Sequence, residues 1–219
     1  MAEMINIIYP QDESTDFLVK IIEDLQQIAS SHINLIRLEN RNQHEVFWKE
    51  IQSMPDDELY MFLGHGGSES INGASTSDCN FGPLIEENQL QLFRNKKVVF
   101  LSCRSNEFLE DFGRNCGVKS GIGFPDMITD IYDVQSAYFN PVIKNIQLED
   151  LVKFKKILVR LFTESIIAYS DNKLTLFGLY HRIKLMTAIE LLTLVKKNES
   201  EVLIEMIRSI KDDLFIFGN

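Results

Sequence analysis

The sequence predicts a single α/β domain over residues 1–219: a three-layer α/β/α sandwich with a mostly parallel central sheet. Three observations predict it. The first two thirds alternate short apolar runs with amphipathic segments at helical spacing. Helix-length connections between strands require parallel pairing, and right-handed crossovers then place helices on both faces. The last third is predicted to be helical and ends in a short apolar run, which we interpret as a closing terminal strand.

The individual elements follow from periodicity and from the residues that end them. We expect strands at residues 4–9, 33–38, 58–63, 97–101, 118–124 and 214–217. We expect helices at residues 14–29, 45–53, 150–169, 174–197 and 199–210. The apolar stripes of the last three helices are interpreted as core rather than as a groove for a partner.

Composition restricts the classes of function. A net charge of −10 repels phosphate backbones, so we expect no nucleic-acid partner. Three irregularly spaced cysteines suit a reducing compartment and not a disulfide framework. The N-terminus does not resemble a signal peptide, and no apolar run approaches the roughly 20 residues that span a bilayer. We therefore expect a cytoplasmic chain with no membrane partner, no metal and no cofactor.

Two chemically reactive side chains follow directly from predicted strands. His65 follows the strand at 58–63, and Cys103 follows the strand at 97–101. Functional crevices of α/β sheets lie beyond the carboxyl ends of the strands. Neighbouring parallel strands lie ~5 Å apart, so these side chains can meet although they are far apart in sequence. We interpret them as a catalytic pair.

Chemistry supports this pairing. A free thiol has a pKa of roughly 8.5 and needs a base, and His65 is the suitable group. A helix is expected to follow Cys103, with Ser105 or Asn106 as its cap, and its positive end favours thiolate. The carboxylate of Glu107 in the first turn opposes this effect.

The glycines around His65 suggest how a substrate would be held. They permit close approach of a substrate backbone. The N–H groups of Gly66 and Cys103 are the candidates for an oxyanion hole. A structural interpretation stays open, since Gly64 and Gly66 can serve a tight turn and a cysteine that ends an apolar strand is commonly inert core.

The remaining histidines and cysteines are weaker candidates. We interpret His32, His44 and His181 as solvated or structural. Cys79 and Cys116 have neither a neighbouring histidine nor a metal-ligand spacing.

Four segments resemble the caspase-like cysteine peptidases of clan CD, above all CHAT-type domains. They are residues 62–66 (FLGHG), 98–105 (VVFLSCRS), 117–124 (GVKSGIGF) and 214–218 (LFIFG). The resemblance implies a cysteine endopeptidase that cleaves a protein substrate, with His65 as base and Cys103 as nucleophile.

The resemblance also bears on specificity. It implies that the segment after the fifth strand helps to form the pocket for the residue before the scissile bond. Several relatives place an acid there that accepts Arg or Lys. Asp126 and Asp130 are the nearer candidates here and Asp133 the more distant one, with solvated loop acids as the alternative. Some relatives have an aspartate two positions before the cysteine, where this chain has Leu101.

CHAT domains often follow helical repeats that sense a signal, and this chain has no such repeats. We therefore expect control by a regulatory protein partner or by proteolytic processing. The loop at residues 67–82, with a turn signal at Asn72 and Gly73, is a candidate mobile element beside the site. Relatives of this kind occur in bacterial immunity and programmed-death modules.

Two other classes of function stay open. One is a catalytically silent caspase-like adaptor that keeps the fold and works by binding; the intact His65 and Cys103 weigh against it. The other is a flavodoxin-like or receiver-like regulatory domain. Receiver chemistry needs carboxylates at the end of the first strand, where residues 9–12 (YPQD) match poorly.

Overall fold

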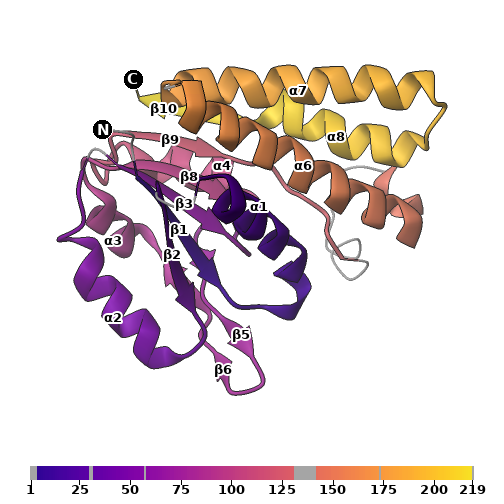
Figure 1. Cartoon of the computed structure of the whole chain (residues 1–219). Coiled ribbons are helices and arrows are strands. Elements are labelled where there is room, and N and C mark those ends of the chain that lie inside the picture. The colour runs from indigo at the N-terminus through magenta and orange to yellow at the C-terminus, as the bar shows by residue number, and fades with distance from the viewer. Residues whose placement is uncertain (1–3, 30–31, 57, 131–141, 173, 219) are drawn as a thin grey trace.

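The computed structural model of the chain describes residues 4–29, 32–56, 58–130, 142–172 and 174–218. At its centre is a six-stranded sheet with the order β2-β1-β3-β8-β9-β10 (Figure 1). The strands are β1 (Ile5–Pro10), β2 (Ile33–Leu38), β3 (Leu59–Leu63), β8 (Lys97–Leu101), β9 (Ser120–Gly123) and β10 (Phe215–Gly218). All neighbours pair in parallel except β10, which runs antiparallel to β9. The predicted fold class is confirmed, closing strand included.

Helices cover both faces of this sheet. They are α1 (Val19–Ala29), α2 (Arg41–Ile51), α3 (Glu87–Leu90), α4 (Ser105–Phe108), α6 (Leu148–Asn172), α7 (Leu176–Lys196) and α8 (Glu201–Asp213). Short helical turns are η1 (Glu13–Leu18), η3 (Gln91–Phe93), η4 (Leu109–Gly113) and η5 (Ile143–Asn145). Figure 1 shows α1 and α6 to α8 on one side of the sheet, with α2 and α3 on the other. No helix within the described ranges is long and apolar enough to cross a membrane.

Alternation along the strands divides the core in two. In β3, Met61 and Leu63 belong to the cluster beneath α1 and α6, whereas Tyr60 and Phe62 belong to the cluster beneath α2 and α3. Successive strand side chains point to opposite faces, so a strand that is buried on both faces is apolar throughout. This explains why the apolar runs of the sequence showed the strands clearly.

Several boundaries differ from expectation for local reasons. The helix expected at 14–29 begins as η1, because Asp12 accepts a hydrogen bond from the Ser14 amide, and only then continues as α1. The helix α2 begins at Arg41 rather than at residue 45. Asn40 and Gln43 form a capping box there, in which each side chain accepts from the other residue's backbone N–H.

The connection from β3 to β8 carries two small antiparallel pairs. These pair β4 (Ile71–Asn72) with β7 (Pro83–Ile85), and β5 (Ser75–Thr76) with β6 (Cys79–Asn80). The tight turn is not at Asn72 and Gly73, as expected, but at residues 77–78 between β5 and β6. The buried side chain of His44 anchors this connection, since its Nε2 accepts a hydrogen bond of 3.0 Å from the Ala74 amide. His44 is therefore structural, and burial lowers its pKa.

The turn after β8 is fixed to the end of β9. Ser105 Oγ donates to the Phe100 carbonyl over 2.6 Å and accepts from the Phe124 amide over 2.9 Å. The expected helix cap at Ser105 or Asn106 is wrong, because α4 already begins at Ser105. Arg104 precedes it in the left-handed conformation, with φ of 54° and no side-chain cap. The Ser105 hydroxyl is thus used to join two strand ends.

Gly123 makes this junction possible, and its replacement gives a test. A Cβ atom at Gly123 would lie 2.5 Å from the Ser105 carbonyl oxygen. We expect Gly123→Ala to lower the free energy of unfolding by about 1–3 kcal/mol, measured by urea denaturation. Gly67→Ala is the control, because an added Cβ there meets no atom within 4 Å. Equal stability of the two variants would contradict the close approach of the two strand ends.

Candidate active site

The carboxyl ends of β1, β3 and β8 meet at one edge of the sheet. Leu63 of β3 pairs with Leu101 of β8, and the Gly64 amide extends this ladder by donating to the Leu101 carbonyl over 3.3 Å. His65 and Cys103 each lie two residues beyond these paired leucines. The chain leaves β1 toward one edge and β3 toward the other, so the crevice between them is the switch point where α/β sheets bind ligands.

The segment after β1 holds the imidazole of His65. Its Nε2 lies 2.6 Å from Ser14 Oγ and 3.7 Å from Asp12 Oδ1. Ser14 Oγ donates to Asp12 Oδ1 over 2.6 Å, so its lone pairs are left to accept a hydrogen bond from Nε2–H. In that tautomer Nδ1 carries the lone pair. The arrangement therefore makes Nδ1 the nitrogen that can take a proton.

The thiol of Cys103 points to the segment after β9, where Sγ donates to the Met127 carbonyl oxygen over 3.0 Å. Glu107 was expected to oppose the thiolate. Its carboxylate instead pairs with the Arg104 guanidinium through bonds of 3.0 and 2.7 Å. The negative charge of Glu107 is thus compensated beside Cys103.

His65 and Cys103 line one small cavity of about 20 Å³, which has room for about one water molecule. The other lining residues are mostly apolar: Thr15, Phe17, Leu18, Gly64, Leu101, Met127, Thr129 and Leu158. Within the described residues, the imidazole bonds to Ser14 and the thiol to Met127, and no hydrogen bond joins the two. The structure therefore brings the expected pair into one cavity, which is too small for a peptide side chain.

Gly66, one of the two oxyanion-hole candidates, packs against the turn that carries Cys103. A Cβ at Gly66 would lie 2.8 Å from Ser102 Oγ. Gly66 forms an isolated bridge with Ile71, and the hydrogen bonds of that bridge come from the flanking residues. Among the described residues the Gly66 N–H has no hydrogen-bond partner, so it remains able to donate to a ligand.

The acidic candidates lie outside the cavity. Asp126 is exposed and Asp130 is half-buried, and neither lines the space around His65 and Cys103. The hydrogen bonds that Arg104 donates to Glu107, and more weakly the charge of Asp126, raise the pKa of Arg104. Asp133 lies outside the described residues.

The sequence interpretation missed Asp12, Ser14 and Met127. A signal for the first two existed, because they follow β1, whose carboxyl end also flanks the switch point of the predicted sheet. Nothing in the pattern indicated Met127, because it acts through its backbone carbonyl, which every residue has.

The other thiols and histidines form no comparable site. Cys116 is buried, its Sγ donates to the Glu87 carbonyl over 3.3 Å, and burial raises its pKa. Cys79 is half-buried in β6, and His181 is an exposed residue of α7. Over the described ranges, no group of three His, Cys, Asp or Glu side chains is arranged to hold a metal ion.

The bond between Ser14 and His65 can be tested by proton–nitrogen correlation NMR of the imidazoles. We expect a slowly exchanging Nε2–H signal for His65, because this N–H donates a hydrogen bond to Ser14 Oγ. Ser14→Ala should abolish it. The Ser14 amide still donates to Asp12 in this variant, over 2.9 Å, so η1 keeps its cap. The exposed His181 should show no such signal. A His65 ring that is protonated mainly at Nδ1 would contradict the assignment.

Comparison with known protein families finds no family model that matches this chain. A search of curated proteins likewise finds no match.

Proposed function

We propose that the chain is a cysteine endopeptidase in which His65 is the general base and Cys103 the nucleophile. The observation that carries the proposal is geometric. Leu63 and Leu101 pair on adjacent strands. His65 and Cys103 each lie two positions beyond these leucines, and both side chains line one cavity. The resemblance to caspase-like CHAT domains supports the same assignment. It also supports a role in a bacterial defence or cell-death module, and the three irregularly spaced cysteines support a cytoplasmic location.

The proposed chemistry assigns one task to each group. The Cys103 thiol gives its proton to His65 Nδ1, and the thiolate attacks the scissile carbonyl carbon. The Gly66 and Cys103 N–H groups donate to the developing oxyanion. His65 then protonates the leaving amine, and water hydrolyses the thioester and restores the thiol. Ser14 and Asp12 are positioning residues that keep Nδ1 toward the sulfur.

The small volume of the cavity supports the proposal that activity is controlled. A cavity of about 20 Å³ does not admit a substrate. In addition, the Cys103 thiol already donates its proton in a hydrogen bond to the Met127 carbonyl oxygen. Activation by a regulatory protein partner or by processing would have to move the Met127 segment. Purified chain that digests substrates fully without partner or processing would refute this control.

The same small cavity favours the second candidate, a catalytically silent adaptor with the peptidase fold. In such a protein the bond from Cys103 to Met127 would be a permanent structural contact. Reactivity of the thiol separates the two functions.

Alkylation with iodoacetamide, followed by peptide mass spectrometry, provides that test. For a peptidase we expect Cys103 to react about tenfold faster than Cys79 and Cys116, since the thiolate is the reactive form. His65→Ala should slow this reaction by a similar factor, whereas His181→Ala should not. Cys103→Ala identifies the labelled site. Equal, slow labelling of all three cysteines would favour the adaptor.

The preference for basic residues is a separate proposal with its own test. If Asp126 or Asp130 receives the residue before the scissile bond, cuts in a peptide library should concentrate after Arg and Lys. Asp126→Asn or Asp130→Asn should then reduce that preference by about tenfold, because a charge pair is lost. Cuts without Arg or Lys preference would reject the acidic pocket and leave the assignment of His65 and Cys103 intact.

A further inference from the structure

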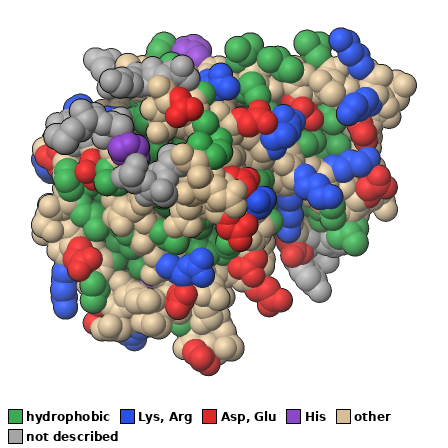
Figure 2. Space-filling view, in the orientation of Figure 1, with side chains coloured by type: hydrophobic (Ala, Val, Ile, Leu, Met, Phe, Trp, Pro, Cys, Tyr) green, Lys and Arg blue, Asp and Glu red, His purple; other side chains and the backbone are tan. Residues whose placement is uncertain are grey.

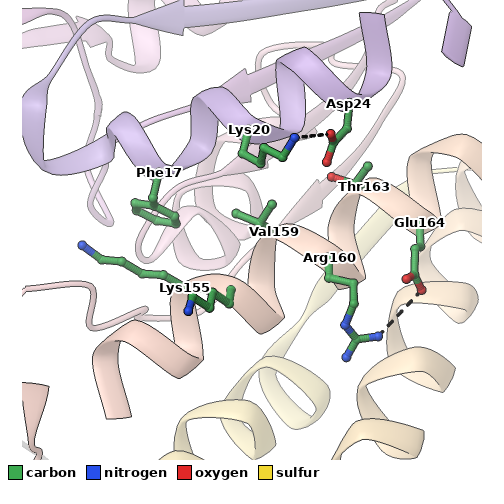
Figure 3. Close-up of a pocket in the computed structure, with 9 residues that line it drawn as sticks. Phe17, Lys20, Asp24, Lys155, Val159, Arg160, Thr163 and Glu164 are labelled. Atoms are coloured by element: carbon green, nitrogen blue, oxygen red, sulfur yellow. Dashed lines mark ion pairs between the residues drawn. The ribbon is translucent and has the colours of Figure 1, made fainter. Parts of the chain in front are cut away.

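A second and much larger cavity lies between two helices on the outer side of the domain. Figure 3 shows it with η1 and α1 on one side and α6 on the other. Its volume is about 380 Å³, within the range of sites for small molecules. The proposed peptidase chemistry uses none of this space.

The surface exposed inside this cavity is largely apolar, although six of its nine lining residues are charged and contribute their aliphatic stems. Phe17 of η1 and Val159 of α6 line it, together with the aliphatic stem of Lys155. The Lys155 ammonium lies 4.8 Å from the centre of the Phe17 ring (Figure 3). Apolar walls with a few polar groups are typical of sites that bind the body of a small organic molecule.

The charges at the cavity leave an excess of cations. Asp24 pairs with Lys20 at 2.7 Å. Glu164 lies 3.8 Å from Arg160, which bonds more closely to Glu190 outside the cavity, at 2.6 Å. Two further cations, Lys155 and Lys156, line the same space and make no ion pair with any residue that the structure describes. Figure 2 shows Lys and Arg side chains over this part of the surface, interspersed with Asp and Glu.

A buried hydroxyl in the cavity wall lacks a partner. Thr163 is 6% exposed and lines the cavity, yet its Oγ1 makes no hydrogen bond within the part of the chain that the structure describes. Buried helical hydroxyls commonly donate to the carbonyl four residues earlier. Ser165 does so to Leu161, and Thr187 to Ile183, each over 2.7 Å. In Figure 3 the Thr163 oxygen points toward the side of Lys20 and Val159, into the cavity.

We propose that this cavity binds a small amphipathic anion. Its apolar or aromatic body lies against Phe17 and Val159. Its carboxylate, phosphate or sulfonate group lies between Lys155 and Lys156. Thr163 Oγ1 is shielded from solvent, so a small turn of the Thr163 side chain toward the cavity lets a polar atom of the ligand supply the hydrogen bond that it lacks. A cationic ligand is disfavoured, because the cations that line the cavity outnumber its acids.

Anilinonaphthalene sulfonate is a suitable probe, because it combines an aromatic body with an anion and fluoresces in apolar surroundings. We expect saturable binding of one probe per chain. Lys155→Glu combined with Lys156→Glu should weaken it by about tenfold or more, through charge repulsion. Phenylnaphthylamine, which has no charge, should bind about tenfold more weakly than the sulfonate.

The control must account for the apolar side chains that α7 exposes, among them Leu185 at 59% and Leu192 at 64%. The matched variant is Lys196→Glu with Lys197→Glu, which reverses two exposed charges at the end of that helix. We expect it to leave probe affinity unchanged. Loss of binding in this variant alone would move the site to α7 and overturn the proposal, as would the absence of saturable binding or equal binding of the uncharged probe.

Thr163→Val tests the hydroxyl separately. Removal of an unpaired buried hydroxyl should leave the free energy of unfolding unchanged or raise it, measured without probe. Probe affinity should nevertheless fall by about 2-fold to 10-fold, the range of one net hydrogen bond. A variant that binds as tightly as the parent chain would remove Thr163 from the site. If the Lys155 and Lys156 variant also binds normally, the cavity is not the binding site.

Discussion

The parallel pairing of β3 with β8 is the constraint on which the candidate site depends. Because Leu63 lies opposite Leu101, the residues that follow the two strands leave the same edge of the sheet side by side. Both strands are buried on both faces, so a shift of one residue would turn core side chains toward the wrong layer. The sheet therefore fixes the positions of His65 and Cys103 through packing that has nothing to do with chemistry.

The sequence predicted the elements that depend on burial and missed those that depend on local polar bonds. The apolar runs of β2 and β8 gave their bounds without error, and the strand ends identified His65 and Cys103. The start of α2, by contrast, is set by a capping box, and the turn after β8 is set by the Ser105 hydroxyl. Such bonds involve common residue types, and their partners become neighbours only in the folded chain.

The two reactive groups illustrate the same limit inside the site. Sequence position and strand pairing explain why they share a cavity. They do not explain what each side chain bonds to, since Ser14 comes from the loop after β1 and the Met127 carbonyl from the segment after β9. The segments that follow other strands thus determine the hydrogen-bond partners of the thiol and the imidazole. The resting state of the site is accordingly a property of loops, whereas its location is a property of the sheet.

Phe17 stands at the boundary of the two cavities and lines both of them. It belongs to the short helix η1, which also contains Ser14 and is capped by Asp12. A molecule that displaces the Phe17 ring on the outer side thereby also changes the wall facing His65 and Cys103. Thermodynamic reciprocity then requires that occupancy of the inner space alter affinity in the outer space by the same factor. The two cavities thus share one aromatic side chain as a common wall.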